Sequence, residues 1–207
     1  MTKLKKRKSI TKSMAIEMIK DQGGTIRTTK AIKMGIHPVT LYKLYETGHL
    51  EKISRGVYRL TELEAISNPD FVMIAARVPH AVICLISALS YHNLTSQIPH
   101  KVSIAIKRDS RKPTIEFPPI SVHRFSPASY QAGIEETIID GVLVRIYNPE
   151  KTIADCFKFR NEIGMDVVLE AIKLYKTRKS FKLDEILKYA GICRVEKVIK
   201  PYLEIIL

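Results

Sequence analysis

The sequence has only three cysteines, and their placement argues against two common roles of this residue. Cys84, Cys156 and Cys193 lie far apart, and none belongs to a Cys-X-X-Cys pair or to a Cys/His cluster. Structural zinc sites need ligands at such short spacings, and disulfide frameworks are typical of small secreted chains with paired cysteines. We therefore expect three small buried side chains, with neither a disulfide nor a structural zinc ion.

Long hydrophobic runs are also missing. No stretch approaches the ~20 apolar residues that a membrane-spanning helix needs. The sequence also shows no charged-then-apolar leader with a cleavage site. We therefore expect a cytoplasmic protein that does not use a membrane as a partner.

The motifs of common enzymes are absent as well. No Lys has Asp or Glu two positions before it, so the full PD-(D/E)xK motif of metal-dependent nucleases is missing. The chain has no Gly-rich phosphate-binding loop, and its histidines show no His-X-His or His-Glu-X-X-His spacing. Asp155 follows a predicted helix start at Asn148 and Pro149, where we interpret it as an exposed capping or surface carboxylate. We expect no enzymatic activity, no catalytic residues, no metal and no cofactor.

Positive charge is present in excess and is unevenly distributed. The 207 residues carry a formal net charge of +13. Residues 1–60 hold fourteen Lys and Arg against four Asp and Glu, whereas residues 61–207 hold twenty against seventeen. Because cations that displace counterions from phosphates supply most non-specific DNA affinity, this asymmetry predicts a nucleic-acid-binding N-terminal part. It also predicts two domains, residues 1–65 with a basic arm at Lys3–Lys8, and residues 66–207.

Residues 25–60 have the pattern of a winged helix-turn-helix. Two short amphipathic segments, Thr28–Met34 and Pro38–Thr47, are separated by Gly35 and Ile36, as in bihelical DNA-binding units. A predicted β-hairpin follows the second helix and would form the wing.

The wing is predicted from two β-prone runs, Leu50–Ser54 and Val57–Leu60, joined across Arg55 and Gly56. Gly tolerates the positive φ that a three-residue hairpin loop needs, so this turn favours a hairpin. Helix, turn, helix and wing in this order predict a DNA reader more strongly than any one of them does.

The second predicted helix has two different faces. At 100° per residue, Leu41, Leu44 and Tyr45 fall on the side that would pack on the preceding helices. The opposite side is small, hydroxylated and basic, which suits a helix in the major groove, where an apolar group can also meet a thymine methyl. On that side lie Val39, Thr40, Lys43 and Thr47. We expect DNA contacts from the two helices and the wing, at Thr28, Thr29, Lys30, Val39, Thr40, Tyr42, Lys43, Lys52, Ser54 and Arg55.

The remaining sequence alternates helical and β patterns. The expected helices are Phe71–Val78, Val82–Leu89, Glu150–Phe159, Val167–Tyr175, Leu183–Tyr189 and Val195–Ile206. The expected strands are Val102–Ile106, Ser121–Phe125, Ile134–Ile139 and Val142–Tyr147. Arg108–Pro119 is expected to be an exposed loop. The predicted fold class is therefore α+β, with an N-terminal winged helix-turn-helix domain followed by a mixed helix/antiparallel-sheet domain.

Three segments of the sequence resemble the AbiEi antitoxins of type IV toxin–antitoxin systems. The first is the winged-helix region, with TLYKL at Thr40–Leu44 and SRGVYR at Ser54–Arg59. The second, CLISALSYHNLT at Cys84–Thr95, is similar to the family's ALSYHGLT segment, and the third, YNPEKTIAD at Tyr147–Asp155, is similar to SPEKTIAD. Asn93 stands where the family pattern has Gly, and Asn also accepts left-handed conformations.

This resemblance implies a bacterial transcriptional autorepressor and antitoxin in one chain. The N-terminal domain would bind double-stranded DNA at inverted repeats in its own promoter, with room for a second copy. The C-terminal domain would counter a nucleotidyltransferase-like toxin encoded alongside. The residues alone show a DNA reader and a companion domain of unstated purpose, so an alternative stays open: a one-component winged-helix regulator whose C-terminal domain binds a ligand or mediates dimers.

Overall fold

The structure, a computed structural model, describes residues 10–63 and 68–206. The chain forms two compact units, one made of residues up to 77 together with 138–143, and one made of residues 78–137 and those from 144 onward. The predicted boundary between residues 65 and 66 and the predicted basic arm at Lys3–Lys8 lie outside the described residues.

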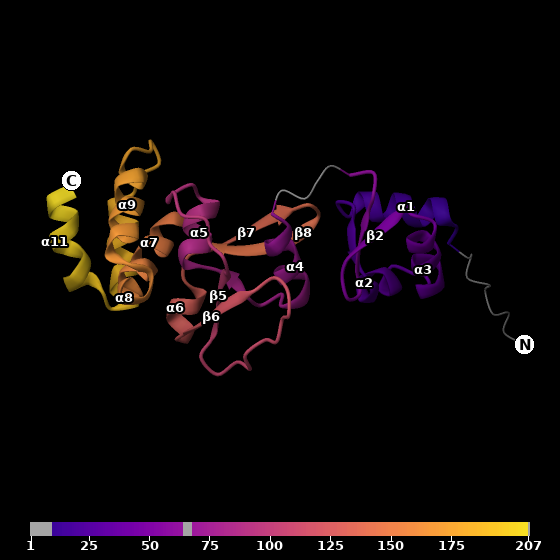
Figure 1. The fold of residues 1–207 in the computed structure, drawn as a ribbon, viewed down its shortest axis with the longest axis horizontal. Helices are drawn as coiled ribbons and strands as arrows, with labels where there is room; N and C mark the ends of the chain where they lie inside the picture. The colour runs from indigo at the N-terminus through magenta and orange to yellow at the C-terminus, as the bar shows by residue number, and fades with distance from the viewer. Residues whose placement is uncertain (1–9, 64–67, 207) are drawn as a thin grey trace, which may run out of the picture. The chain divides into compact units, whose positions relative to one another are not determined.

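The N-terminal unit begins with short helices and a three-stranded sheet, drawn in indigo to purple in Figure 1. The strand order is β1-β3-β2, and both pairings are antiparallel. The elements are α1 (Lys12–Asp21), β1 (Thr25–Arg27), α2 (Thr28–Lys33), α3 (Pro38–Glu46), β2 (Leu50–Ser54), β3 (Val57–Leu60) and α4 (Pro69–Arg77). The two predicted strands of the wing have the predicted bounds, and the two predicted helices each end one residue early. The bounds of α1 and the short edge strand β1 were not predicted.

Apolar side chains from each of these elements up to β3 meet in one small core. The core positions of α3 are Leu41 and Leu44, with 1% and 0% of their surface exposed, as the spacing predicted. Their neighbours in the core are Ala15, Ile19, Ile26, Ala31, Ile36, Leu50 and Leu60. Because α3 is held by one buried stripe, the opposite side of this helix is free to face solvent or a partner.

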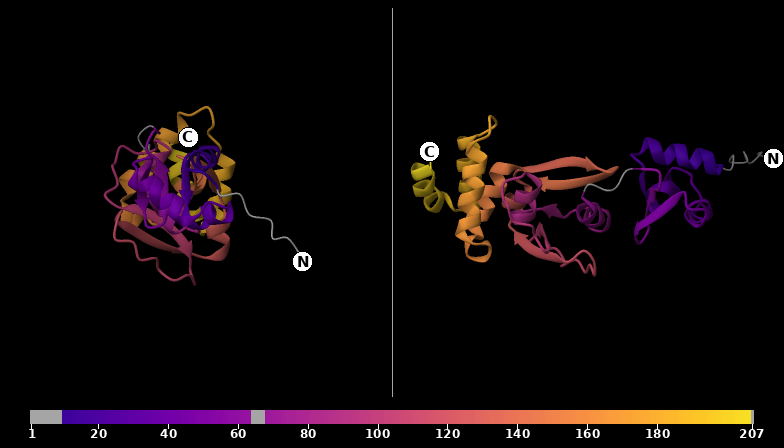
Figure 2. Two further views of the ribbon diagram at one scale, coloured as in Figure 1. Left: turned by 90° about the vertical axis from the view of Figure 1, so that its right-hand side faces the viewer. Right: turned by 45° about the horizontal axis from the view of Figure 1, so that its top comes forward.

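The C-terminal unit consists of helices around a five-stranded sheet of order β6-β5-β4-β8-β7, except that residues 138–143, at the β7–β8 turn, are counted with the first unit. The C-terminal helices gather beside this sheet, in orange and yellow in Figure 2. The strands are β4 (Val82–Ile83), β5 (Val102–Lys107), β6 (Ile120–Phe125), β7 (Ile134–Ile139) and β8 (Val142–Tyr147). The helices are α5 (Leu85–Tyr91), α6 (Pro127–Gln131), α7 (Pro149–Lys158), α8 (Arg160–Ile163), α9 (Met165–Lys176), α10 (Leu183–Cys193) and α11 (Glu196–Ile206). The α+β class is thus confirmed.

Two features of this sheet differ from the prediction. The sheet is mixed, because β5 pairs in parallel with β6 and β4 pairs in parallel with β8. Parallel neighbours need a connection of about a dozen residues or more, and the loop over 108–119 has that length. The sequence pattern identified this loop but did not indicate whether β6 runs parallel or antiparallel to β5.

The predicted helix Val82–Leu89 is wrong at its start. Val82 and Ile83 form β4, the central strand of the sheet, and α5 begins only at Leu85. A short apolar run has no polar positions to reveal its period, so helix and buried strand cannot be told apart by spacing. The β-branched pair Val82-Ile83 favours the strand.

Helix α7 passes through the core of the C-terminal unit. It begins as predicted, because the Asn148 side chain accepts a hydrogen bond from the backbone N–H of Lys151 and Pro149 occupies the first turn. Asp155, however, is 0% exposed and not a surface carboxylate. Its Oδ2 lies 2.5 Å from Nζ of Lys151, and the Lys151 side chain is also 0% exposed. Helix α7 therefore buries an ion pair between two residues one helical turn apart.

Candidate nucleic-acid interface

Helix α3 is fixed at both ends by side chains. His37 precedes it, and its ring Nδ1 accepts a hydrogen bond from the backbone N–H of Val39 at 3.2 Å. Thr47 follows it, and its hydroxyl donates to the carbonyl oxygen of Lys43 at 2.7 Å. Thr47 was predicted on the DNA-facing side, but its hydroxyl closes the end of the helix.

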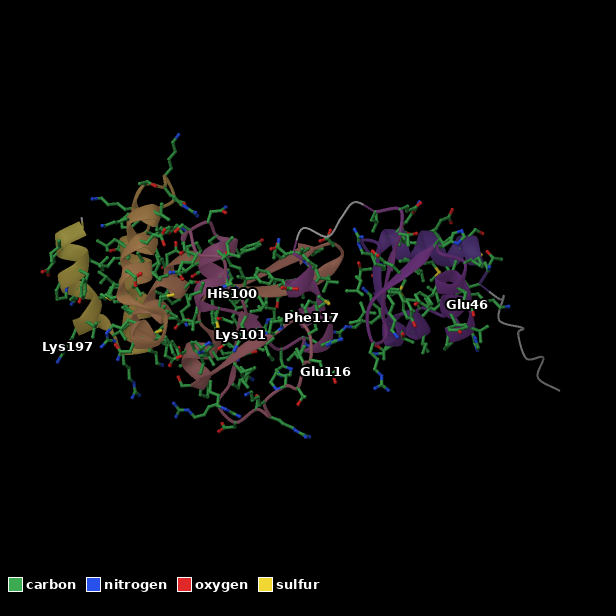
Figure 3. The ribbon with its side chains drawn as sticks, in the orientation of Figure 1. Glu46, His100, Lys101, Glu116, Phe117 and Lys197 are labelled. Carbon is green, nitrogen blue, oxygen red and sulfur yellow. The ribbon has the colours of Figure 1, made fainter. Side chains whose placement is uncertain are left out.

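The face of α3 opposite Leu41 and Leu44 is exposed. It carries the side chains of Val39 and Tyr42, which are 51% and 56% exposed. Lys43 and Glu46 are exposed on the same side, and Figure 3 labels Glu46 at the end of α3. At 100° per residue these four positions surround the direction opposite to the buried stripe. This set is the outer face of α3. It differs from the predicted face by including Tyr42 and Glu46, by lacking Thr47, and by leaving Thr40 half-buried at its edge.

Tyr45 departs from the prediction that it packs into the core. Its side chain is 42% exposed, and its ring meets the edge of the Tyr58 ring on β3, with centroids 6.0 Å apart and planes at 62°. The buried stripe of this nine-residue helix is narrower than the predicted one, because Leu41 and Leu44 alone reach the core. Tyr45 instead joins the helix to the sheet at the margin of the domain.

The wing is the β2–β3 hairpin, and its turn contains Arg55 and Gly56. Gly56 has a φ of 73°, the left-handed conformation that favoured Gly at this position. Lys52 and Arg55 are both exposed, so the wing presents two cations to solvent. This geometry is that of a hairpin able to contact phosphates.

Ser54 does not share the exposed side of the wing with Lys52. Its side chain is 5% exposed, and its hydroxyl oxygen is buried without a hydrogen-bond partner among the described residues. Strict alternation would place residues two apart on one face, but the pairing of β2 with β3 shifts register between Lys52 and Ser54. We therefore leave Ser54 out of the DNA surface.

The start of α2 is tied to the wing. The backbone N–H of Thr28 donates to the carbonyl oxygen of Gly56 at 2.8 Å, and the Thr28 hydroxyl donates to the same oxygen at 3.2 Å. Thr29 and Lys30 are exposed beyond this contact. Thr28 therefore holds the wing turn against the start of α2, whereas Thr29 and Lys30 are accessible to a partner.

Not every cation of this domain is available to DNA. Arg59 on β3 is 3% exposed, and its Nη1 lies 3.0 Å from a carboxylate oxygen of Glu51.

On the outer face of α3, the neighbouring Glu46 carboxylate raises the pKa of Tyr42, chiefly through a hydrogen bond. Tyr42 thus remains a neutral phenol with an accessible ring.

Sequence reasoning missed two residues of this region, Glu46 on the outer face of α3 and His37, which caps the helix. The signal for His37 was Pro38, since Pro favours the first helical position and makes the residue before it the cap. The signal for Glu46 was its spacing of seven residues from Val39, two turns along the same face.

Three further expectations concern features outside this surface. Cys84, Cys156 and Cys193 are free and buried. Over residues 10–63 and 68–206, no group of three or more His, Cys, Asp or Glu side chains is arranged to hold a metal ion. None of the described helices has the length and apolarity that crossing a membrane requires.

A helix-turn-helix whose second helix exposes one face beside a basic hairpin wing is a DNA-binding winged helix. Residues 14–61 match the family model described as transcriptional regulator, AbiEi antitoxin. This match confirms the resemblance to AbiEi antitoxins over the winged helix. The similar segments at Cys84–Thr95 and Tyr147–Asp155 lie outside the matched residues.

The whole fold is similar to a solved structure, the crystal structure of the RV2827C protein from Mycobacterium tuberculosis. The TM-score is 0.51 at 12% sequence identity, and the similarity covers 93% of this chain and 80% of that chain. At this identity the likeness concerns the fold alone. No curated protein matches the sequence significantly.

Proposed function

We propose that this chain is the autorepressor and antitoxin of a type IV toxin–antitoxin operon, acting in the cytoplasm and without enzymatic activity. Its winged helix binds inverted repeats in its own promoter, one copy on each half-site, and residues 66–207 counter a nucleotidyltransferase-like toxin. The observation that carries the proposal is the outer face of α3 beside the exposed Lys52 and Arg55 of the wing, on a domain that matches AbiEi regulators.

The proposed DNA contacts follow from exposure. Val39, Tyr42 and Lys43 on α3 face the major groove, with Thr40 at the edge of this face. Lys52 and Arg55 on the wing, and Thr29 and Lys30 on α2, contact phosphates or adjoining bases. Thr28 supports these contacts by holding the wing turn.

The DNA-binding half of the proposal is tested by titrating the full chain against its own upstream region and against a duplex of shuffled sequence. Lys43→Ala or Arg55→Ala should weaken promoter binding by ~1–3 kcal/mol if a base contact is lost, or reduce the salt slope by about one if a phosphate contact is lost. Lys188→Ala is the matched control, because Lys188 is an exposed cation on α10 paired with Glu185. Promoter affinity and salt slope that stay at the wild-type values in both α3 and wing variants would contradict the interface.

The antitoxin half is tested by co-expression with the neighbouring gene. The full chain should restore growth, and the Lys43→Ala/Arg55→Ala double variant should lose promoter binding while it still restores growth, because rescue is assigned to the C-terminal residues. Failure of the wild-type chain to restore growth would leave a transcriptional regulator only.

One observation favours a second candidate function, a one-component regulator that responds to a small molecule. The C-terminal unit contains a pocket of about 320 Å³, a size at the lower end of ligand sites. Its lining is polar: His92, Glu135, Asn148, Pro149, Glu150, Tyr175, Ser180, Lys182 and Glu185. The test is promoter affinity measured with and without a deproteinised cell extract. A shift in affinity that Glu135→Gln abolishes supports this function, and an unchanged affinity argues against it.

A further inference from the structure

The outer face of α3 carries two large apolar side chains where a purely phosphate-binding surface needs none. Val39 and Tyr42 are 51% and 56% exposed, and they lie three residues apart, on adjacent turns of one face. Phosphates are bound by cations, hydroxyls and backbone N–H groups, so the isopropyl group of Val39 contributes nothing to them. The Tyr42 hydroxyl is hydrogen-bonded to Glu46, which leaves the apolar ring as its exposed part. These two apolar groups suit a partner other than a phosphate.

The charges around the two side chains indicate which part of DNA they meet. Lys43 is exposed beside Tyr42 on the same face, and Lys52 and Arg55 are exposed on the wing. These cations suit the phosphates that border the groove. Glu46, seven residues and two helical turns from Val39, carries the opposite sign and would repel a phosphate. The strip from Val39 to Glu46 consequently faces base edges and not the backbone.

Only one group on the major-groove edge of a base pair is apolar, the C5-methyl of thymine. We propose that Val39 and Tyr42 select thymines at fixed positions of the operator by packing against their C5-methyl groups. This inference rests on the proposed DNA-binding function and adds to it the chemistry by which α3 distinguishes sequences. Lys43 contributes affinity that does not depend on the thymine methyl, whether it meets a phosphate or a polar base edge.

The expected size follows from the burial of one methyl group. Removing a buried methyl costs ~0.8 kcal/mol, which corresponds to about a fourfold weaker Kd for each contacted thymine. A duplex that keeps its sequence and its phosphates but lacks thymine methyls should thus bind at least about fourfold more weakly, with an unchanged salt slope.

The experiment uses the full chain and four duplexes. The upstream region and a shuffled sequence are each prepared with thymidine and with deoxyuridine, which pairs like thymidine but lacks the C5-methyl. Wild-type protein should prefer the upstream thymidine duplex over its deoxyuridine form. Val39→Ser and Tyr42→Ala should each reduce this preference toward one. Lys43→Ala, the control on the same helix face, should weaken binding to both forms and leave their ratio unchanged. Circular dichroism checks that all three variants are folded.

The possible results distinguish the thymine-methyl inference from the proposed DNA-binding function. Equal wild-type binding to the thymidine and deoxyuridine forms of the upstream region overturns the inference while the proposed function stands. A thymidine preference that persists unchanged in both Val39→Ser and Tyr42→Ala also overturns it. The preference would then arise from a change in DNA shape on loss of the methyl groups, and not from contacts with these two side chains. A wild-type chain that does not distinguish the upstream region from the shuffled sequence in either form overturns the proposed function itself.

Discussion

Replacing Lys151 by Met should strongly destabilise the C-terminal unit. Lys151 and Asp155 are both 0% exposed, and their ion pair is 2.5 Å long. The ammonium of Lys151 also lies 4.3 Å from the ring centre of Tyr147, and the thiol of Cys193 donates to the other carboxylate oxygen at 3.1 Å. Removing one partner of a buried pair leaves an uncompensated charge and costs ~3–5 kcal/mol.

The double variant Lys151→Met/Asp155→Leu separates the loss of the pair from the loss of packing. Replacing both charges by apolar side chains of similar size is often neutral or stabilising, because neither charge then has to be desolvated. We therefore expect the double variant to be more stable than Lys151→Met by several kcal/mol. The assay is urea unfolding followed by circular dichroism at 222 nm, with the slope m compared between variants.

The pH dependence of the Lys151→Met variant gives a second readout. Burial raises the pKa of Asp155 above its ordinary value, and Lys151 opposes this rise. Without Lys151, folded Asp155 holds its proton at higher pH than the unfolded chain does, so the free energy of unfolding falls as pH rises above the ordinary Asp range. Lys151→Met/Asp155→Asn, which keeps the packing but cannot ionise, should lose this dependence. A Lys151→Met chain as stable as the wild type at pH 8 would refute the reasoning.

Other predictions follow from single contacts. Leu44→Ala in the core of the winged helix should cost ~2–5 kcal/mol and abolish promoter binding through unfolding, and a folded variant that binds normally would mean that α3 is turned the wrong way. Ser54→Ala should leave promoter affinity unchanged, whereas Lys52→Ala should lower the salt slope by about one if Lys52 meets a phosphate, as two parallel titrations would show. Asn148→Ala should lower the unfolding free energy of the C-terminal unit by ~0.5–2 kcal/mol, and Asn148→Asp should restore most of it, because Asp caps a helix equally well.

Local chemistry made much of this fold predictable. The hairpin strands Ile134–Ile139 and Val142–Tyr147 have the predicted bounds, and Asp140 and Gly141 both have positive φ, as a two-residue type I′ turn requires. Asn93 has a φ of 52°, the left-handed conformation expected where the family pattern has Gly. These features depend on residues close together in the sequence, which is why the sequence reveals them.

The errors arose where distant residues decide the outcome. Asp155 is buried because α5, α9 and α10 surround α7, and nothing within its own helix signals that. Ser54 is buried because β2 changes register against β3 after Lys52. The exposed face of α3 was predicted in outline from periodicity. Its centre lies closer to Glu46 than predicted, because Leu41 and Leu44 pack into the core and Tyr45 does not.

Under the proposed function, the contact of Thr28 with Gly56 would constrain the operator as well as the protein. Both the backbone N–H and the hydroxyl of Thr28 hold the same carbonyl oxygen, at 2.8 and 3.2 Å, so the wing turn is fixed to the first helix of the reader. If α3 and the wing contact DNA at a fixed separation, their targets must also lie at a fixed separation along the duplex. One base pair inserted between the bases under α3 and the phosphates under the wing would shift these targets by about 3.4 Å and rotate them around the duplex. Half-sites recognised by this chain should therefore tolerate base changes more readily than changes of length.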